Sequence, residues 1–430
     1  MSRLSISCGS NRALKLSRNQ AITMSNVNMQ PNQSTWRRII IFLCFFIVSF
    51  MFIFNLPSRV NTAIQCGQID IAKSSNVAGE VEISADGTTR VDRKPFFPFG
   101  FYHVSWGSTV EERRNHLREI ADAGFNIIHA SFKPEESLDD YEKFLDEANS
   151  LGVRVITEFG LEPKIDPSVV VSRFKHKPAV FGWNIADDAG VHKMNPINPQ
   201  QVLSLHCQIK NIDPDHITYI SGSLYKVLKF ANSADAIGFQ TYPIGHQPKQ
   251  PISVAHKVIA KIVASVPQNR LVIANSQAFS RYYENSPVPT FNEVRNMTYQ
   301  AIVAGAKGII YYTYYDEGKW YLLEHPDLWQ GIQSLVPEIK NIDPILLEGE
   351  RRKVNTRTKN AISGMWTLED RGLVIVINTS FDRSQEISLN LPTDSVRAAF
   401  ANRSDDLKFE NGKLSGVLPP LAVGVYSFKA

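Results

Sequence analysis

Short apolar segments alternate with amphipathic helical segments from Phe96 to about Leu347. Eight apolar segments have the length and composition of buried strands. They span residues 97–104, 125–130, 154–160, 180–188, 217–222, 235–242, 270–279 and 308–315. Helical patterns lie over 110–123, 138–151, 199–212 and 291–304, and Gly124 and Gly152 follow two of them at a favoured cap position. Eight such units in about 250 residues predict an α/β fold, a (β/α)8 TIM barrel. A doubly wound sheet would show a similar alternation.

Different patterns flank this region on both sides. Residues 81–91 alternate around Asp86-Gly87, which predicts a hairpin in a position to close the bottom of the barrel. After Leu347 the period changes to two, over 373–378, 385–391, 396–399 and 421–428, with turn residues between the segments. We therefore predict a TIM-barrel domain over 80–348 and a C-terminal all-β sandwich domain over 349–430.

The first 79 residues predict a membrane anchor. Residues 39–58 carry no charge, and a helix of about twenty residues spans the roughly 30 Å of a bilayer core. Residues 1–38 hold six Lys or Arg and no acid, which predicts a cytoplasmic basic tail. Residues 59–79 are polar and suggest a stalk. A cleaved signal peptide is the alternative. Either way the main body is expected to be extracellular, periplasmic or luminal.

Charge and cysteine content narrow the possible partners. The net charge is +4, and the six positive residues of the tail leave −2 for the rest of the chain (+4 − 6). A mildly acidic main body argues against a nucleic acid partner. Of the four cysteines, Cys8 and Cys44 fall in the tail and the predicted span, so only Cys66 and Cys207 could pair in an oxidising compartment. No CxxC, P-loop, GxSxG or strand-following GxGxxG occurs, and we predict no cofactor and no metal site. The oligomeric state stays open.

Candidate chemistry lies at the ends of the predicted strands, where TIM barrels carry their catalytic residues. The clearest case is residues 181–188, an apolar strand that ends in Asp187 and Asp188. Adjacent strand residues point to opposite sides, so one of these acids should face the barrel axis, although either Asp could instead cap the next segment. Glu158 ends the preceding strand. Carboxylates, amides and aromatic rings on one rim are typical of sugar sites, where a carboxylic acid protonates the glycosidic oxygen.

Several of these segments resemble clan A glycoside hydrolases. Residues 95–102 resemble the opening strand of that group, 182–188 its fourth-strand motif, 235–243 its sixth strand, and 299–311 its last helix and strand. The resemblance covers about 80–348, and a trailing β-sandwich is usual in the group. It implies hydrolysis of a glycosidic bond by an acid at the end of strand four, here Asp188.

Two departures from the group affect the expected mechanism. The strand-four acid is usually Glu, whereas Asp188 stands here. The nucleophile of the group is a Glu at the end of strand seven, whereas Gln277 stands here, and an amide cannot form the covalent intermediate. Glu158 is the first candidate for a second carboxylate, with Asp316 and Glu317 behind it. An inverting reaction on such a pair needs carboxyl groups about 6.5–9.5 Å apart.

Our hypothesis is a membrane-anchored glycoside hydrolase that acts on a polysaccharide or glycoconjugate. Asp188 would be the general acid, Asp187 would support it, and Glu158 would be the base. Substrate contacts are expected from His103, Trp183, Gln240, Tyr242, Gln277, Tyr312, Tyr314 and Trp320. The alternative is a protein that binds glycans or assists polysaccharide assembly at the membrane without cleaving them.

Overall fold

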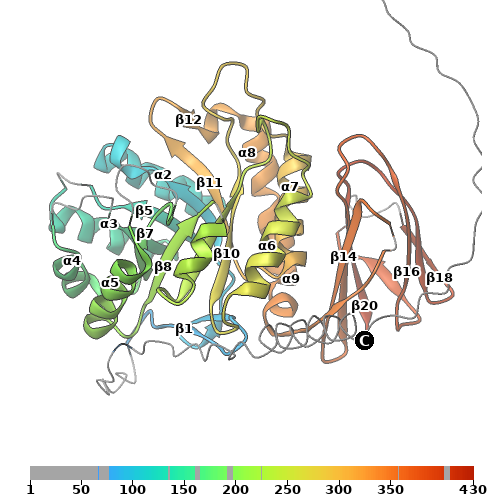
Figure 1. The fold of residues 1–430 in the computed structure, drawn as a ribbon, viewed down its shortest axis with the longest axis horizontal. Helices are drawn as coiled ribbons and strands as arrows, with labels where there is room; N and C mark the ends of the chain where they lie inside the picture. Colours follow the sequence, from blue (N-terminus) through green and yellow to red (C-terminus); the bar gives the residue numbers. More distant parts are fainter. Residues whose placement is uncertain are drawn as a thin grey trace, which may run out of the picture. The chain divides into compact units, whose positions relative to one another are not determined.

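A computed structural model describes residues 66, 77–133, 136–159, 165–190, 197–223, 225–356, 358–400 and 407–430. The predicted tail and span, and most of the predicted stalk, lie outside these residues. Within the part that is described, no helix is both long and apolar enough to cross a bilayer. The described chain consists of a barrel of parallel strands followed by two antiparallel sheets (Figure 1).

Eight parallel strands form the barrel. They are β4 (Phe99–His103), β5 (Ile127–Ser131), β6 (Arg154–Glu158), β7 (Val180–Ala186), β8 (Ile217–Gly222), β9 (Ala236–Thr241), β10 (Leu271–Gln277) and β11 (Ile309–Asp316). Each strand pairs with the next along the chain, and β11 pairs with both β10 and β4, which closes the ring. The short β12 (Trp320–Tyr321) runs antiparallel to β11. The predicted TIM barrel is confirmed.

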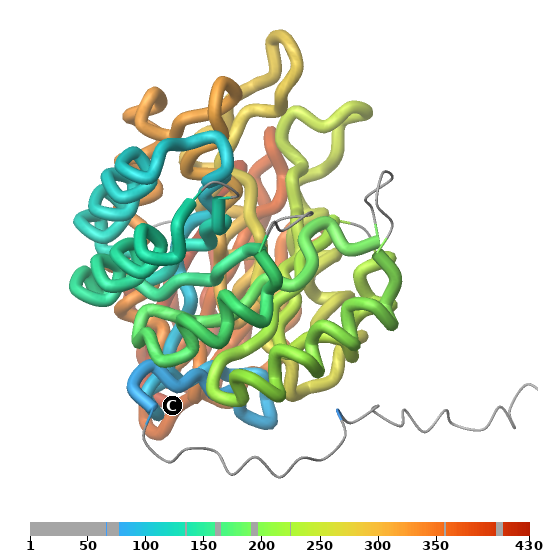
Figure 2. Tube along the Cα trace, turned by 90° about the vertical axis from the view of Figure 1, so that its left-hand side faces the viewer, coloured from blue at the N-terminus to red at the C-terminus, as the bar shows by residue number. Residues whose placement is uncertain are grey.

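Helices surround the barrel. They are α2 (Val110–Asp122), α3 (Leu138–Ser150), α4 (Pro167–Phe174), α5 (Pro199–Ile212), α6 (Val254–Ser265), α7 (Phe291–Ala304), α8 (Pro326–Gln333) and α9 (Leu335–Glu348). Figure 2 shows the cyan-to-green helices α2 to α5 on the outside of one flank. Capping boxes at Thr109, Asn198 and Thr290 begin α2, α5 and α7 and satisfy amides that a helix start leaves free.

A small three-stranded sheet closes the bottom of the barrel, as the hairpin pattern predicted. It comprises β1 (Val81–Ile83), β2 (Thr89–Val91) and β3 (Lys94–Pro95). The amide of Val81 donates to the carbonyl of Asp215, just before β8, and Lys307, just before β11, pairs with Asp86 at 2.7 Å. Val81 and Val91 pack against side chains inside the barrel. The barrel can therefore hold a functional site at its opposite end, where the parallel strands finish.

The C-terminal strands form two sheets with a shared apolar core. One sheet has the order β13 (Glu350–Lys353), β14 (Ala361–Leu368), β15 (Arg371–Asn378), β20 (Val423–Lys429) and β17 (Val396–Ala398). The other has the order β16 (Gln385–Asn390), β19 (Lys413–Leu418) and β18 (Leu407–Glu410). Strand β15 is apolar from Leu373 to Ile377, because Val374 and Val376 face the second sheet while Leu373 and Ile375 face the barrel helices.

Helix α7 joins the barrel to the first sheet. Its residues from Val294 to Ala304 are all buried. Arg295 forms an ion pair with Glu338 at 3.1 Å and donates to the carbonyl of Val423. Asn296 donates from Nδ2 to the carbonyls of Asn378 and Leu421. The side chains of Asn296 and Asn378, which both stand in N-glycosylation sequons, are therefore enclosed and hydrogen-bonded.

A disulfide joins Cys66 to Cys207 on α5, with a Cα–Cα distance of 5.1 Å. It is the pair expected from the sequence.

Candidate active site

Two register shifts in β7 decide which acid faces the barrel axis. Pairing with β6 skips a residue between Val180 and Gly182, and pairing with β8 skips one between Asn184 and Ala186. As a result Trp183 faces the helices, and the second shift turns Asp187 inward. An uninterrupted alternation from Trp183 would have directed Asp187 outward.

A chain of hydrogen bonds connects the ends of six of the eight barrel strands. Gln240 Nε2 donates to Ser221 Oγ at 3.2 Å, and Ser221 Oγ donates to Asp187 Oδ1. Tyr102 Oη lies 3.4 Å from Asp187 Oδ2 and donates to Glu158 Oε2 at 2.7 Å. Ser131 Oγ donates to the same Glu158 oxygen at 2.9 Å. The chain therefore runs through β9, β8, the end of β7, β4, β6 and β5.

The two carboxyl groups of this chain are close and perturb each other. Since Tyr102 Oη contacts both, Glu158 Oε2 and Asp187 Oδ2 are separated by no more than about 6 Å (2.7 Å plus 3.4 Å). Burial, followed by the charge of Asp187, raises the pKa of Glu158 to about 8. Burial and the charge of Asp188 raise the pKa of Asp187 to about 6. Both shifts favour a protonated carboxyl group, and the larger shift is that of Glu158, so a proton held by the pair favours Glu158 over Asp187.

A neutral histidine lies beneath the pair. His129 is fully buried, and burial lowers its pKa to about 3. Its ring stacks on Tyr102 with the centroids 4.0 Å apart. With the amide nitrogen of Asn184 donating to Nε2 at 2.9 Å, the ring carries its proton on Nδ1, which lies 3.8 Å from Glu158 Oε2. The site thus contains an uncharged donor next to Glu158.

Asp188 occupies the next position along the chain, with a left-handed φ of 48°. Its charge contributes to raising the pKa of Asp187, Tyr242 and Tyr312. Its main-chain amide hydrogen-bonds the carboxylate of Asp187, whereas its side chain is not part of the hydrogen-bond chain.

Aromatic rings border the carboxyl pair on the β9–β11 side. Tyr312 lies between Tyr102 and Tyr242, with ring centroids 5.1 and 5.6 Å away, and Phe279 packs edge-on against Tyr242 and Tyr312. The hydroxyl of Tyr242 is buried and has no hydrogen-bond partner among the described residues. Four residues from the sequence-based set thus share this end of the barrel with the acids: Gln240, Tyr242, Tyr312 and, through its charge, Asp188.

Other expected substrate contacts lie on the outer side of the barrel wall. His103 bonds His116 and Ser105 through its two ring nitrogens, both at 2.9 Å. Trp183 is fully buried and donates to Asp213 at 2.7 Å. These two side chains therefore belong to the packing between barrel and helices.

Three more residues that were expected to contact substrate lie apart from the acids or bond other groups. Tyr314 is buried among the outer helices, where its hydroxyl donates to Glu119. Trp320 on β12 stacks on His325 with centroids 4.2 Å apart. Gln277 is fully buried and bonds the main chain of Ile244 through both ends of its amide, at 2.9 and 3.0 Å. Gln277 thus holds the loop after β9.

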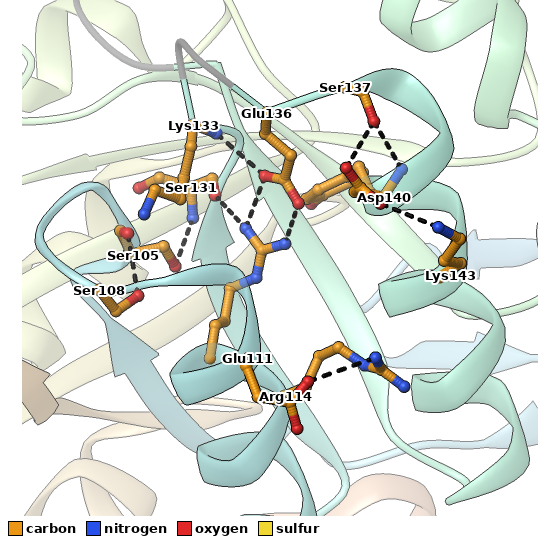
Figure 3. A network of polar contacts seen from close by, with 12 residues as sticks. Ser105, Ser108, Glu111, Arg114, Ser131, Lys133, Glu136, Ser137, Asp140 and Lys143 are labelled. Atoms are coloured by element: carbon orange, nitrogen blue, oxygen red, sulfur yellow. Dashed lines mark hydrogen bonds and ion pairs between the residues drawn. The ribbon is translucent and has the colours of Figure 1, made fainter.

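A buried ion pair helps to fix Ser131, one of the two hydroxyl donors to Glu158. Arg113 and Glu136, both fully buried, pair with each other, and Arg113 also donates to the carbonyl of Ser131 at 3.2 Å. The amide of Ser131 donates to Ser105 Oγ at 3.2 Å. Figure 3 shows Ser105, Ser131 and Glu136 in this network. Ser131 is held on both sides of its main chain, which fixes the hydroxyl that reaches Glu158.

Sequence reasoning missed Tyr102, Ser131 and Ser221 as donors to the acids. A signal existed for Tyr102, because Phe99 and Phe101 share one face of β4 with His103 and leave Tyr102 on the other. Nothing in the sequence pairs Ser221 with Asp187, since that contact depends on the register shift in β7. Among the described residues, no three His, Cys, Asp or Glu side chains group in a way that could hold a metal ion.

Comparisons with solved structures identify the fold. Eubacterium rectale Amy13B superposes with a TM-score of 0.56 at 10% identity, over 82% of this chain and 98% of its own. An alpha-amylase from Anoxybacillus gives 0.51 at 12% identity, over 77% and 98%. A gamma-CGTase from the alkalophilic Bacillus clarkii gives 0.55 at 12% identity, over 77% and 70%. No protein-family model matches the sequence, and neither does any curated protein. The chain thus has the TIM-barrel fold of glycoside hydrolases, as the sequence resemblance predicted.

Proposed function

We propose that this protein hydrolyses glycosidic bonds in a polysaccharide or glycoconjugate, with Glu158 and Asp187 as the reacting pair. The observation that carries the proposal is the pair itself: two carboxyl groups, hydrogen-bonded through Tyr102, at the end of the barrel where this fold carries its chemistry. The TIM-barrel likeness to glycosidases is consistent with it.

The two acids divide the work by their protonation. Glu158, held protonated by burial and by the charge of Asp187, would give its proton to the leaving glycosidic oxygen. Both hydroxyl donors that reach Glu158 end on Oε2, which leaves Oε1 for the substrate. Asp187, ionised and oriented by Ser221, would attack the anomeric carbon. Water would then add to that carbon and release Asp187, while Glu158 takes the proton of the water.

This assignment differs from the inverting reaction expected from the sequence. The upper limit of about 6 Å between Glu158 Oε2 and Asp187 Oδ2 is shorter than the roughly 6.5–9.5 Å that separates the carboxyl groups of inverting pairs. It accommodates the roughly 5–5.5 Å of retaining pairs. Asp188 would then act on Asp187 through its charge instead of serving as the general acid. Tyr242 and Tyr312 would supply ring faces and a hydroxyl to the sugar.

We also propose that the reaction takes place outside the cytoplasm. The uncharged stretch over residues 39–58 would anchor the chain, the basic residues over 1–38 would stay in the cytoplasm, and residues 59–79 would connect the anchor to the barrel domain at 80–348 and the sandwich domain at 349–430. The Cys66–Cys207 disulfide supports an oxidising location for the main body.

The test is hydrolysis by the purified full-length chain on a panel of polysaccharides, followed as new reducing ends. Glu158→Gln and Asp187→Asn are expected to lower turnover by at least about a thousandfold, because each removes one of two acids that act together. Asp188→Asn serves as the matched control and should keep measurable turnover. The first-formed anomer should retain the configuration of the substrate. Loss of activity in Asp188→Asn alone would contradict the assignment.

A non-catalytic glycan-binding protein is the second candidate, and one observation favours it. The strand-seven position that carries the nucleophile in clan A enzymes holds Gln277, whose amide bonds the main chain of Ile244 and of Phe279. On this reading the wild type yields no product on any polysaccharide and still retains glycan, and the Asp187→Asn variant binds as the wild type does.

A further inference from the structure

A groove lies where α9 meets the first C-terminal sheet, well removed in the chain from the carboxyl pair. Its cavity volume is about 570 Å³, and it is open to solvent on one side. Ile342 and Ile345 of α9 form part of its floor, and both are buried. Arg371 on β15, Arg397 on β17 and Lys429 on β20 line its wall. Three cations thus border one recess.

Strand register places the three cations on one face of the sheet. Arg371 stands directly opposite Lys429, and Arg397 stands opposite Ser427, two residues before Lys429. Leu373 and Val425, which alternate in step with Arg371 and Lys429, pack into the core on the barrel side. The cations therefore share the face that is turned toward α9.

This arrangement is unfavourable without an anion. Like charges that stand directly opposite in an antiparallel pair destabilise it. Asp370 is the carboxylate that lines the groove, which leaves three positive groups against one negative. Among the described residues, neither the guanidinium groups of Arg371 and Arg397 nor the ammonium of Lys429 forms an ion pair with a carboxylate. The groove has an excess of two positive charges that no described side chain neutralises.

We propose that this groove binds an acidic polysaccharide through its carboxylate or sulfate groups. The choice of a glycan as the carrier of the charge rests on the proposed function. Guanidinium groups match the two oxygens of a carboxylate or sulfate, and Ser427 of β20 and Asn341 of α9 add hydrogen-bonding groups to the lining. The apolar floor gives the sugar rings a surface to lie on. A flat anionic membrane fits poorly, because Ile342 and Ile345 are buried in the recess.

The site would hold the polymer on the sandwich while the barrel acts on another part of it. Such a second contact raises the local concentration of bonds that can be cleaved without adding contacts to the reacting unit. It also makes acidic polymers the substrate class to try first for the carboxyl pair.

The experiment measures binding of the full-length chain, kept in neutral detergent, to polygalacturonate, dextran sulfate and uncharged dextran. We expect binding to one or both acidic polymers, none to dextran, and weakening with added salt. The triple variant Arg371→Gln, Arg397→Gln, Lys429→Gln should bind the acidic polymer at least about tenfold more weakly. Binding by polygalacturonate alone would identify carboxylates, and binding by dextran sulfate alone would identify sulfates.

A second triple variant controls for net charge. Lys359→Gln, Lys408→Gln, Lys413→Gln removes three exposed cations from other parts of the sandwich and should leave binding unchanged. Neither triple variant should unfold at a lower temperature than the wild type, because all six side chains are on the surface. Equal binding by the groove variant and the wild type would overturn the proposal. So would equal weakening in both variants, or groove-dependent binding only to vesicles containing phosphatidylserine.

Binding and turnover are separable in this design. Asp187→Asn should bind acidic polymer as the wild type does, whatever its effect on hydrolysis. If no variant or wild type cleaves any polymer while the groove variant loses binding, the catalytic proposal fails and the groove proposal stands.

Discussion

Replacing Asp187 by Asn tests whether the two acids act on each other as the structure indicates. The substitution keeps a side chain that can bond Ser221 and removes one negative charge no more than about 6 Å from Glu158 Oε2. At an effective dielectric constant of about 20, two charges at that separation interact by about 2.8 kcal/mol, which is about 2 pKa units. The pKa of Glu158, raised to about 8 in the wild type, should therefore fall to about 6 in the variant.

Infrared difference spectroscopy across pH 5 to 9 follows this change without any need for substrate. The wild type should keep the carbonyl band of a protonated carboxyl group to about pH 8, and Asp187→Asn should lose it near pH 6. Glu158→Gln, which lacks the group, identifies the band. An unchanged titration in Asp187→Asn, or a Glu158 that is already ionised at pH 5, would refute the reasoning.

The raised pKa of Glu158 also predicts how the stability of the protein depends on pH. Because Glu158 stays protonated in the folded chain while it ionises above about pH 4.5 when unfolded, the free energy of unfolding should fall as pH rises from about 4.5 to 8. In Asp187→Asn the part of that fall that lies above about pH 6 should be absent. A steeper fall in the variant than in the wild type would contradict the assignment.

Three further results are expected elsewhere in the chain. Glu136→Gln leaves the guanidinium of Arg113 buried without its carboxylate and should lower the free energy of unfolding, measured with denaturant, by about 3–5 kcal/mol. As a control, Lys143→Gln removes an ion pair on the surface and should change this free energy by less than about 1 kcal/mol. Cys207→Ser removes a link between cysteines 141 positions apart and should cost up to about 5 kcal/mol, with reductant having the same effect on the wild type alone. In a eukaryotic secretory host Asn296 and Asn378 should carry no glycan, since their amides are buried and hydrogen-bonded, and a mass change at either on deglycosylation would show that the site is accessible before folding.

The strands and four of the helices were predictable because local signals agree with the fold. Each of the eight apolar segments became one barrel strand, and capping residues such as Thr109 and Thr290 begin predicted helices. Helix α9 was not predicted, because Pro344 lies inside it and a proline normally ends a helix. Helix α6 was not predicted either, and Ser253 at its start makes no side-chain cap, so the capping signal that begins α2, α5 and α7 is missing there.

The site residues could be predicted only where the sequence indicates which side of the strand each residue faces. Asp187 and Glu158 were predicted as candidates from their position at strand ends, whereas Trp183 was assigned to the wrong side because the first register shift in β7 changes the alternation. His103 was misplaced for a simpler reason, since it shares a face with Phe101, which packs under the helices. That both ends of the Gln277 amide bond Ile244 in the loop after β9 depends on tertiary contacts that no local pattern encodes.

Helix α7 has a consequence for how this architecture could change over evolutionary time. All residues of this helix from Val294 to Ala304 are buried, and Arg295 and Asn296 bond main-chain carbonyls of the sandwich. Over these residues no face of the helix is suited to contact with water. A chain without the last eighty or so residues would expose these apolar side chains and leave the amide of Asn296 without its two main-chain acceptors. We therefore expect the barrel to depend on the sandwich for its stability, so that the two domains would be lost or kept together.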